Sequence, residues 1–280
     1  MISSEIPPSV VESIRRALEE DIGSGDITTS LLIPEEDVSK ARYIAKDTFT
    51  LAGIPFAQEV FHILHPSIEW TSFFTDGDKI VKGDVLAELS GKTSIILTGE
   101  RVSLNILQRL SGIATLTSAY VERIRGLKAR IVDTRKTVPG MRFMEKYAVR
   151  KGGGYNHRFG LFDGILIKNN HIKAVGSVSE AVKRAKAAHH LVKIEVEVES
   201  LRDLDQAVEA GADIVMLDNM SVSDMKEAVQ IIQGRLLLEA SGGINLDNVR
   251  EIASTGVDII SVGALTHSAA AVDISLQLVG

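Results

Sequence analysis

The sequence predicts a parallel α/β sheet, closed or nearly closed into a (β/α) barrel, preceded by a smaller β-rich part. Strand-like and helix-like segments alternate six times in the second half. Before Gly99, by contrast, the sequence has short strand-like runs separated by turn residues. Such alternation favours parallel strands, because each parallel pair needs a crossover connection that is usually a helix. An open, doubly wound sheet is the alternative, and the spacing alone does not exclude it.

The residues before Gly99 predict a small module. We expect a helix over 8–20, a turn rich in Gly, Asp and Thr over 21–30, and a strand over 39–44. Residues 75–94 alternate turn residues with short apolar pieces, which is typical of small β-rich modules. From residue 99 a long helix is predicted. Its apolar residues at helical spacing are Val102, Leu104, Ile106, Leu107, Leu110, Ile113 and Leu116.

The rest of the chain supplies the strands and helices of the barrel. The predicted strands are 129–134, 164–170, 193–200, 212–219, 235–241 and 257–264. The predicted helices between them include 177–189, 200–211 and 221–234. These three helices open with Ser and carry an acidic residue in the first turn, as helix starts commonly do.

Charge is distributed unevenly in this acidic protein. The formal net charge is −6 over 280 residues, yet residues 133–171 hold eight Lys and Arg against three carboxylates. That stretch carries about +5 and the remainder about −11, which indicates a focused anion site. A pI near 5.7 argues against nucleic acid as the main partner.

Composition sets further bounds on the class of protein. The chain has no cysteine, which excludes disulfides and thiolate metal sites and fits a reducing compartment. Neither an apolar signal core nor an apolar run of transmembrane length is present. We therefore expect a cytoplasmic protein without a membrane partner.

Charges and glycines stand at the ends of nearly all the predicted strands. In parallel α/β barrels the chemistry lies beyond the carboxyl ends of the strands. A single polar residue there often marks only a strand exit, but six such ends together indicate a site. In chain order they are Asp133 to Lys136, Lys168 to His171, Glu197 with Glu199, Asp218-Asn219, Glu239 with Ser241 to Gly243, and Gly263-Ala264.

The segment 193–200 is the most informative of these strands. Ile194, Val196 and Val198 share one face, and Glu195, Glu197 and Glu199 share the other. If the apolar face meets the helices, the glutamates point into the barrel, where buried carboxylates need cations or a metal. The alternative is an edge strand with its glutamate face in water.

Two glycine-containing turns are candidate phosphate sites. Ser241-Gly242-Gly243 and Gly263-Ala264 each lie between a predicted strand and a helix, where backbone N–H groups can approach an anion. Barrel phosphate sites commonly use the last two strand–helix loops. A P-loop at Gly91-Lys92-Thr93 is excluded, because Leu86 occupies the position of its first glycine.

Lys168 alone also fits a Schiff-base lysine of a barrel aldolase. The several cations that converge on the same strand ends suit a multiply anionic substrate better. Both hypotheses remain open at this point.

Several motifs resemble the quinolinate phosphoribosyltransferase family. The similarity is carried by residues 133–172, DTRKTVPGMRFMEKYAVRKGGGYNHRFGLFDGILIKNNHI. It extends to EEDIGSGDITT, GERVSLNILQRLSGIAT, EVEVES, VMLDN, EASGGI and VGALTH, and so covers almost the whole chain. The resemblance implies conversion of quinolinate and phosphoribosyl pyrophosphate to nicotinate mononucleotide, carbon dioxide and pyrophosphate, in NAD biosynthesis.

The resemblance also implies an architecture. The family fold is a small N-terminal α/β sandwich followed by an incomplete (β/α) barrel with parallel strands. Carried over to this chain, the sandwich spans 1–103 with the tail 268–280 returning to it, and the barrel spans 104–267. A homodimer, possibly assembled further, is expected.

Site residues follow from the matched motifs. Arg135, Lys136, His157, Arg158 and Lys168 are expected to bind the quinolinate carboxylates, with Thr134 beside them and Arg101 supplied by the partner subunit. Glu197 and Asp218 would hold Mg²⁺ and the ribose. Ser241, Gly242, Gly243, Val262, Gly263 and Ala264 would bind the 5′-phosphate. The expected catalytic groups are Lys136, Lys168, Glu197 and Asp218.

One further alternative stays open. A non-catalytic or altered-substrate relative that only binds phosphorylated ligands would keep the loop at Ser241 and Gly242. It would not require both Arg135 and Arg158.

Overall fold

The computed structural model describes residues 6–188 and 191–279. Contacts group the chain into two compact units. The first comprises residues 1–118, 137–153 and 268–280, and the second comprises 119–136 and 154–267. These units are defined by contacts, and the domain boundary at residues 103 and 104 stays a prediction.

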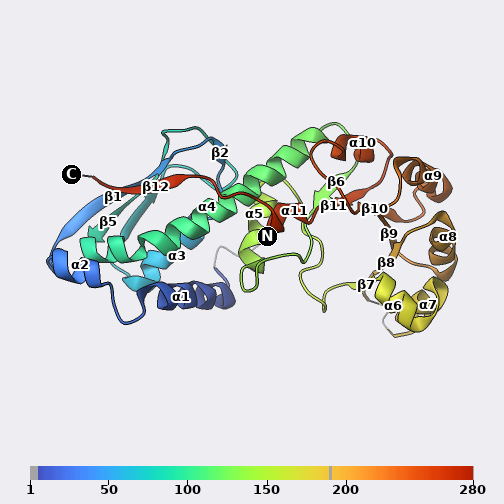
Figure 1. Ribbon diagram of the computed structural model, residues 1–280, viewed down its shortest axis with the longest axis horizontal. Helices are drawn as coiled ribbons and strands as arrows, with labels where there is room; N and C mark the ends of the chain where they lie inside the picture. Colours follow the sequence, from blue (N-terminus) through green and yellow to red (C-terminus); the bar gives the residue numbers. More distant parts are fainter. Residues whose placement is uncertain (1–5, 189–190, 280) are drawn as a thin grey trace. The chain divides into compact units, whose positions relative to one another are not determined.

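The first unit is built on a four-stranded sheet with the order β12-β1-β5-β3. Its strands are β1 (Val38–Ala45), β3 (Glu69–Ser72), β5 (Val85–Lys92) and β12 (Ile274–Val279), and a separate pair joins β2 (Phe49–Thr50) to β4 (Lys79–Ile80). The C-terminal strand β12 runs antiparallel to β1, with Lys40 opposite Val279 (Figure 1). The predicted β-rich character of this part is confirmed.

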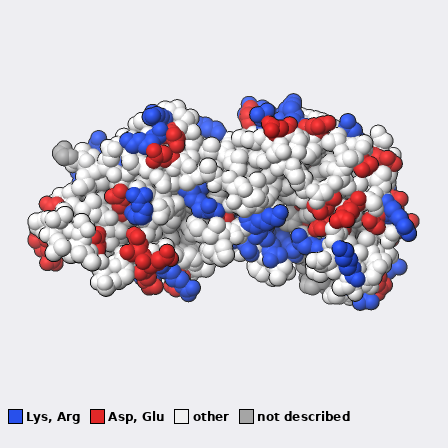
Figure 2. Space-filling view, in the orientation of Figure 1, with Lys and Arg blue, Asp and Glu red and all other residues white. Residues whose placement is uncertain are grey.

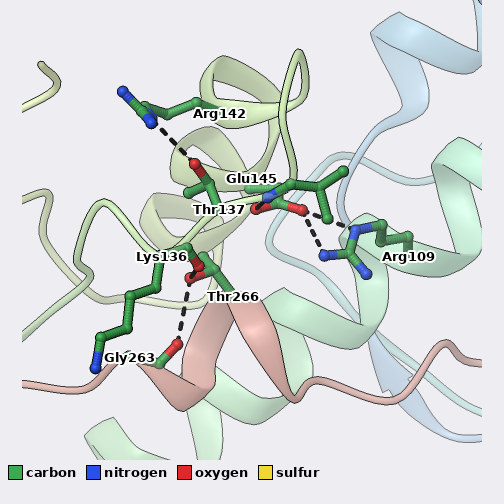
Figure 3. A network of polar contacts seen from close by, with 8 residues as sticks. Arg109, Lys136, Thr137, Arg142, Glu145, Gly263 and Thr266 are labelled. Carbon is green, nitrogen blue, oxygen red and sulfur yellow. Dashed lines mark hydrogen bonds and ion pairs between the residues drawn. The ribbon is translucent and has the colours of Figure 1, made fainter.

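The helices of the first unit are α1 (Pro8–Ile22), α2 (Ile27–Leu32), α3 (Ile54–Leu64), most of α4 (Thr93–Arg123) and α5 (Arg142–Lys151). The core contains Tyr43 of β1, whose hydroxyl lies 2.6 Å from the hydroxyl of Ser103 on α4. On α5 the buried Glu145 accepts a hydrogen bond from Nε of Arg109 at 2.8 Å (Figure 3). Burial nevertheless raises the pKa of Glu145.

Two predictions for this part need correction. The long helix begins at Thr93, six residues before its predicted start. The predicted turn over 21–30 contains the start of helix α2, because the carboxylate of Asp26 accepts the backbone N–H of Thr29 at 2.9 Å and caps a short helix. Helix α3 was not predicted from the sequence.

The second unit contains a six-stranded sheet with the order β6-β11-β10-β9-β8-β7, in which all neighbouring strands are parallel. Its strands are β6 (Arg130–Val132), β7 (Ile165–Ile167), β8 (Ile194–Val198), β9 (Ile214–Asp218), β10 (Leu237–Ser241) and β11 (Ile259–Ser261). Its helices are α6 (Asn169–Val175), α7 (Val178–Ala188), α8 (Leu201–Ala210), α9 (Val222–Ile232), α10 (Val249–Ala253) and α11 (Ala264–His267).

The strand order distinguishes a barrel from a doubly wound sheet. From β7 to β11 the order follows the chain without reversal, and β6 then lies beside β11. A doubly wound sheet reverses direction at its switch point, so that alternative is wrong. Right-handed crossovers connect the successive parallel strands. Because these crossovers all advance in the same direction, the helices lie on one face of the sheet, and the sheet curls so that its other face points inward (Figure 1). Because the order ends at β6 and β7 within the described residues, the barrel is incomplete, and the predicted fold class is confirmed.

Two details of the predicted strands change. Strand β8 pairs with β7 and β9 on its two sides, so it is not an edge strand. Strand β7 stops at Ile167, and the predicted strand residues Asn169 and Asn170 instead begin α6. The predicted helix 177–189 is found as α7, and its residue 189 lies outside the described residues. Among the described helices, none combines the length and the apolar character needed to cross a membrane.

Candidate active site

A cavity of about 760 Å³ lies within the second unit, at the carboxyl ends of its strands. Figure 2 shows Lys and Arg gathered beside a hollow, over the loop that precedes β7. The lining residues are Thr134, Arg135, Lys136, His157, Arg158, Leu166, Lys168, Glu197, Met216, Asp218, Asn219, Glu239, Ser241, Gly242, Gly243, Ile244, Ser261, Val262, Gly263, Ala264 and His267.

The structure brings together every predicted site residue except one. Arg101 is exposed on α4 in the first unit and is not among the residues that line the cavity. The others come from the ends of the six barrel strands, from the segments that follow them, and, for His157 and Arg158, from the loop between α5 and β7. Their roles toward substrates remain predictions.

The carboxylate-binding candidates Arg135 and Arg158 lie close enough to repel each other. Burial first, and then the positive charge of Arg135, lower the pKa of the Arg158 guanidinium. Nη1 of Arg158 donates to the backbone oxygen of Gly164 at 2.8 Å, which fixes one side of its planar fork. Two guanidiniums held together against their repulsion suit a ligand with more than one negative group.

Lys136 is positioned by Gly263 and helix α11, which follow β11. The hydroxyl of Thr266 donates to the backbone oxygen of Lys136 at 2.7 Å (Figure 3). A Cβ added at Gly263 would lie 2.9 Å from Cδ of Lys136, so the lysine stem packs against the glycine backbone. A side chain at position 263 would displace the lysine, and the glycine is needed for this close approach.

Two carboxylates face the cavity from neighbouring strands. Burial raises the pKa of Glu197, and the negative charge of Asp218 raises it further, whereas the charge of Lys168 lowers it. Nζ of Lys168 lies 3.8 Å from Oε2 of Glu197. Mg²⁺ is commonly held by one or two carboxylates together with substrate phosphates. The mutual repulsion of Glu197 and Asp218 is what such a cation would relieve, so these residues fit the ion.

A second carboxylate pair lies deeper in the barrel, beneath His157. Nε2 of His157 lies 3.0 Å from Oε2 of Glu195 and 3.5 Å from Oε2 of Glu239. Burial and the charge of Glu195 raise the pKa of Glu239 to about 8, so Glu239 carries a proton at neutral pH.

The ring of His157 decides what this deeper cluster can bind. Its Nδ1 accepts the backbone N–H of Arg158 at 2.8 Å, so in the neutral ring the proton is on Nε2. A protonated Nε2 donates to Glu195 and is not available to a metal ion. Although the three side chains are close enough to hold a metal, the tautomer makes them a proton-holding cluster.

The glycine turn after β10 approaches its neighbours closely. Gly242 has a φ of +91°, and a Cβ there would lie 2.2 Å from Oδ1 of Asn219. Gly243 also has a positive φ, of +62°. The backbone of this turn is therefore left bare toward the cavity, as the predicted anion site requires.

Several lining residues were missed as site candidates. Glu239 and Asn219 were named among the polar strand ends, but neither was given a role in the site. The others are Leu166, Met216, Ile244, Ser261 and His267. Ser261 lies on β11 just before the predicted turn, whereas the apolar members carry no chemical signal in the sequence.

The fold and the cavity together define an α/β-barrel protein whose cavity is lined by cations on one side and by a carboxylate pair on the other. The chain belongs to the quinolinate phosphoribosyltransferase family. The model of the family's N-terminal domain matches residues 26–111, and the model of its C-terminal domain matches residues 113–277.

Individual relatives agree over nearly the full length. The chain is 46% identical to a probable carboxylating nicotinate-nucleotide pyrophosphorylase of Bacillus subtilis, over 92% of this chain and 90% of that protein. It is 43% identical to the carboxylating enzyme of that name from Mycobacterium leprae, over 95% of this chain and 96% of the relative. A solved nicotinate-nucleotide pyrophosphorylase from Francisella tularensis has a TM-score of 0.94 and 45% identity, covering 98% of each chain. The resemblance seen in the motifs is confirmed.

Proposed function

We propose that this protein joins quinolinate to 5-phosphoribosyl 1-pyrophosphate and releases nicotinate mononucleotide, carbon dioxide and pyrophosphate, a step of de novo NAD biosynthesis. The observation that carries the proposal is the match of both family domains to a chain whose barrel cavity holds cations beside two carboxylates. The enzyme is a phosphoribosyltransferase of the glycosyltransferase class.

The acceptor site is assigned to the cationic side of the cavity. Arg135 and Arg158 offer guanidinium forks that match planar carboxylates, and Lys136 and Lys168 add positive charge. His157 lies between these groups and the buried glutamates, which hold its ring in place. Thr134 supplies a hydroxyl that accepts the backbone N–H of Lys136 at 3.1 Å and shapes the turn.

The second substrate is assigned to the acidic side and the glycine turns. Glu197 and Asp218 would hold Mg²⁺, which when bound supplies positive charge to the pyrophosphate oxygens. The backbone of Ser241, Gly242 and Gly243, with Val262 to Ala264, would receive the 5′-phosphate.

The chemistry needs no protein nucleophile. The pyridine nitrogen of quinolinate forms a bond to ribose carbon 1, and the bond from that carbon to pyrophosphate breaks, with pyrophosphate taking the electron pair. The chain's contribution is to align the two substrates and to stabilise the charge that develops. Glu197, whose Oε2 lies 3.8 Å from Nζ of Lys168, is placed to steady positive charge on the ribose.

Loss of carbon dioxide follows from the charge of the new pyridinium. The bond between ring carbon 2 and its carboxylate breaks, the electron pair stays on carbon 2, and a proton then replaces the carboxylate there. Lys136 or Lys168 can stabilise the transient negative charge, since both line the acceptor side.

Assembly and location are part of the proposal. Arg101 is exposed on α4, outside the cavity lining of its own chain. Its place in the family motif supports a homodimer in which it completes the partner's acceptor site. The absence of cysteine from the sequence supports a reducing, cytoplasmic location.

The two alternative functions are weaker. A Schiff-base lysine must lose its charge through desolvation, whereas the Lys168 side chain is 54% exposed and lies beside Glu197. A protein that only binds phosphorylated ligands would not need Arg135 and Arg158 held against their repulsion.

The test is an assay of purified protein with quinolinate, phosphoribosyl pyrophosphate and Mg²⁺, in which product mass is followed. We expect nicotinate mononucleotide and loss of one carbon dioxide per turnover. Nicotinate as the competing acceptor distinguishes this activity from that of non-carboxylating enzymes. Binding of phosphoribosyl pyrophosphate without turnover would favour the binding-only alternative, and trapping of a carbonyl substrate by borohydride without phosphoribosyl transfer would favour the Schiff-base alternative.

A further inference from the structure

Asp133 connects the two loops that carry the paired arginines. The residue follows β6 directly and has no exposed surface. Its Oδ2 accepts from Nδ2 of Asn156 at 2.7 Å, and its Oδ1 accepts the backbone N–H of His157 at 2.9 Å. Both oxygens of one buried carboxylate thus bind the loop that precedes β7.

Backbone contacts reinforce the connection. Tyr155 forms a parallel bridge with Val132, its N–H donates to the oxygen of Ile131 at 2.9 Å, and its oxygen accepts from the N–H of Asp133 at 3.1 Å. The loop therefore lies along β6 on the side away from β11. Arg135 lies two residues after Asp133, and Arg158 lies one residue after His157. Both arginines line the cavity.

The contacts of Asp133 matter because the two arginines beside it carry like charges. Arg135 and Arg158 repel each other, as the lowered pKa of Arg158 indicates. In the absence of a ligand, this repulsion favours their separation. Small displacements of positioned groups carry large penalties in rate and binding, so the spacing has to be set by buried contacts that do not depend on the substrate.

We infer that Asp133 is a positioning residue that sets the spacing between Arg135 and Arg158, and thereby the preference for an acceptor with two adjacent carboxylates. The inference rests on the proposed function, because it assigns the spacing of that same acceptor site. Asp133 itself is buried and is not among the residues that line the cavity. It acts through Asn156 and through the backbone of His157.

The test exchanges the two partners of the hydrogen bond in the full-length protein. In Asn156→Asp two carboxylates would face each other across 2.7 Å, and in Asp133→Asn a new amide could accept only one of the two N–H donors. The double variant Asp133→Asn/Asn156→Asp restores a donor opposite an acceptor and leaves a carbonyl oxygen for the N–H of His157.

Steady-state kinetics on both substrates is the readout. We expect Asn156→Asp to raise the KM for quinolinate about 10- to 100-fold, the range for a lost charge-assisted hydrogen bond. The KM for phosphoribosyl pyrophosphate should stay within about twofold, and the double variant should recover most of the loss, as coupled partners do. Asp258→Asn is the matched control, because Asp258 also accepts a backbone N–H, that of Leu238 at 3.0 Å, at the opposite ends of the strands.

The outcomes separate this inference from the proposed function. Equal rises in both KM values with a lowered melting temperature, or no recovery in a folded double variant, would overturn the positioning role. Absence of turnover in the wild-type protein would contradict the proposed function but not the positioning role of Asp133. In that case the position of the Arg158 guanidinium in crystals of the wild type, Asn156→Asp and the double variant would still test the spacing, and an unmoved guanidinium would overturn it.

Discussion

Oε2 of Glu239 lies 3.5 Å from Nε2 of His157, inside the barrel and almost wholly shielded from water. Burial and the neighbouring charge of Glu195 raise the pKa of Glu239 to about 8. The folded protein therefore holds a proton on this side chain that the unfolded chain releases above the ordinary glutamate pKa of 4.5. The stability that depends on this proton is complete below that value and is lost as the pH rises to about 8.

Glu239→Gln should remove this dependence. We expect the free energy of unfolding of the variant to rise relative to that of the wild type as the pH increases from about 5 to 8. The rise should be on the order of 1 kcal/mol per pH unit, with no further change above that window. Denaturant unfolding at several pH values measures the difference. Glu209→Gln on the exposed face of α8 controls for the loss of one carboxylate. A constant difference between Glu239→Gln and wild type across the window would contradict the prediction.

Lys168→Ala should move the acid limb of the rate profile. Lys168 lowers the pKa of Glu197 against burial and the charge of Asp218, so its removal raises that pKa and leaves less ionised Glu197 at a given pH. We expect the acid limb of kcat/KM for phosphoribosyl pyrophosphate to shift to higher pH. Lys168→Arg keeps the charge and should leave the limb near its wild-type position. An unshifted limb in Lys168→Ala would show that Glu197 does not control it.

Arg158→Lys tests the planar fork separately from the charge. A lysine retains the positive charge but cannot donate in parallel to a carboxylate while holding Gly164. We expect the affinity for quinolinate to fall about 10- to 100-fold, the equivalent of about 1.5–3 kcal/mol. Calorimetric titration measures this, with Arg202→Lys on exposed α8 as control. Full affinity and activity in both Arg158→Lys and Arg158→Ala would show that the carboxylate pocket is elsewhere.

Gly242→Ala should lower the catalytic efficiency of the protein with phosphoribosyl pyrophosphate. The new Cβ would push against Asn219, whose amide donates to Asp218 at 3.1 Å, and the left-handed backbone adds about 1–2 kcal/mol of strain. We expect kcat/KM for that substrate to fall about tenfold or more. Gly243→Ala has a similar backbone but open space for its Cβ, so the loss should be smaller. Equal effects of the two variants would remove the role of the contact with Asn219.

Mixed dimers test whether Arg101 acts across the interface. Arg101→Ala and Lys136→Ala subunits should each be nearly inactive alone. In a heterodimer one of the two sites would contain both wild-type residues, so we expect about half of the wild-type activity per heterodimer. Separately tagged subunits, purified as verified heterodimers, provide the measurement. Absence of recovery would count against a shared site.

Patterns along the chain predicted the elements whose side chains alternate or recur regularly. Strand β8 is the clearest case, because Val196 and Val198 are buried against the helices while Glu195 and Glu197 turn inward. Helix α2 was not predicted, because its start depends on one capping hydrogen bond that Asp26 accepts. It has no periodic pattern of apolar residues that would reveal it. The end of β7 was also misplaced, since Asn169 fits a strand exit and a helix start equally well.

The site was predictable in membership but not in internal geometry. Strand ends in a parallel barrel must converge, so charges there could be grouped from the sequence. Which nitrogen of His157 carries the proton depends on the backbone N–H of Arg158, and the closeness of Glu195 to Glu239 depends on how tightly the sheet curls. Neither is encoded in residue type or spacing. Gly242 could be recognised as a turn glycine, but its contact with Asn219 could not.

The pairing of β12 with β1 has a consequence for how the polypeptide matures during synthesis. The barrel segments end at residue 267, whereas the sheet of the first unit needs residues 274–279 as its outer strand. Until residues 274–279 have been synthesised, β1 has one of its edges open. The sheet of the first unit is therefore completed only after the barrel segments have been made, and a chain that lacks residues 274–279 would have an unpaired strand prone to self-association.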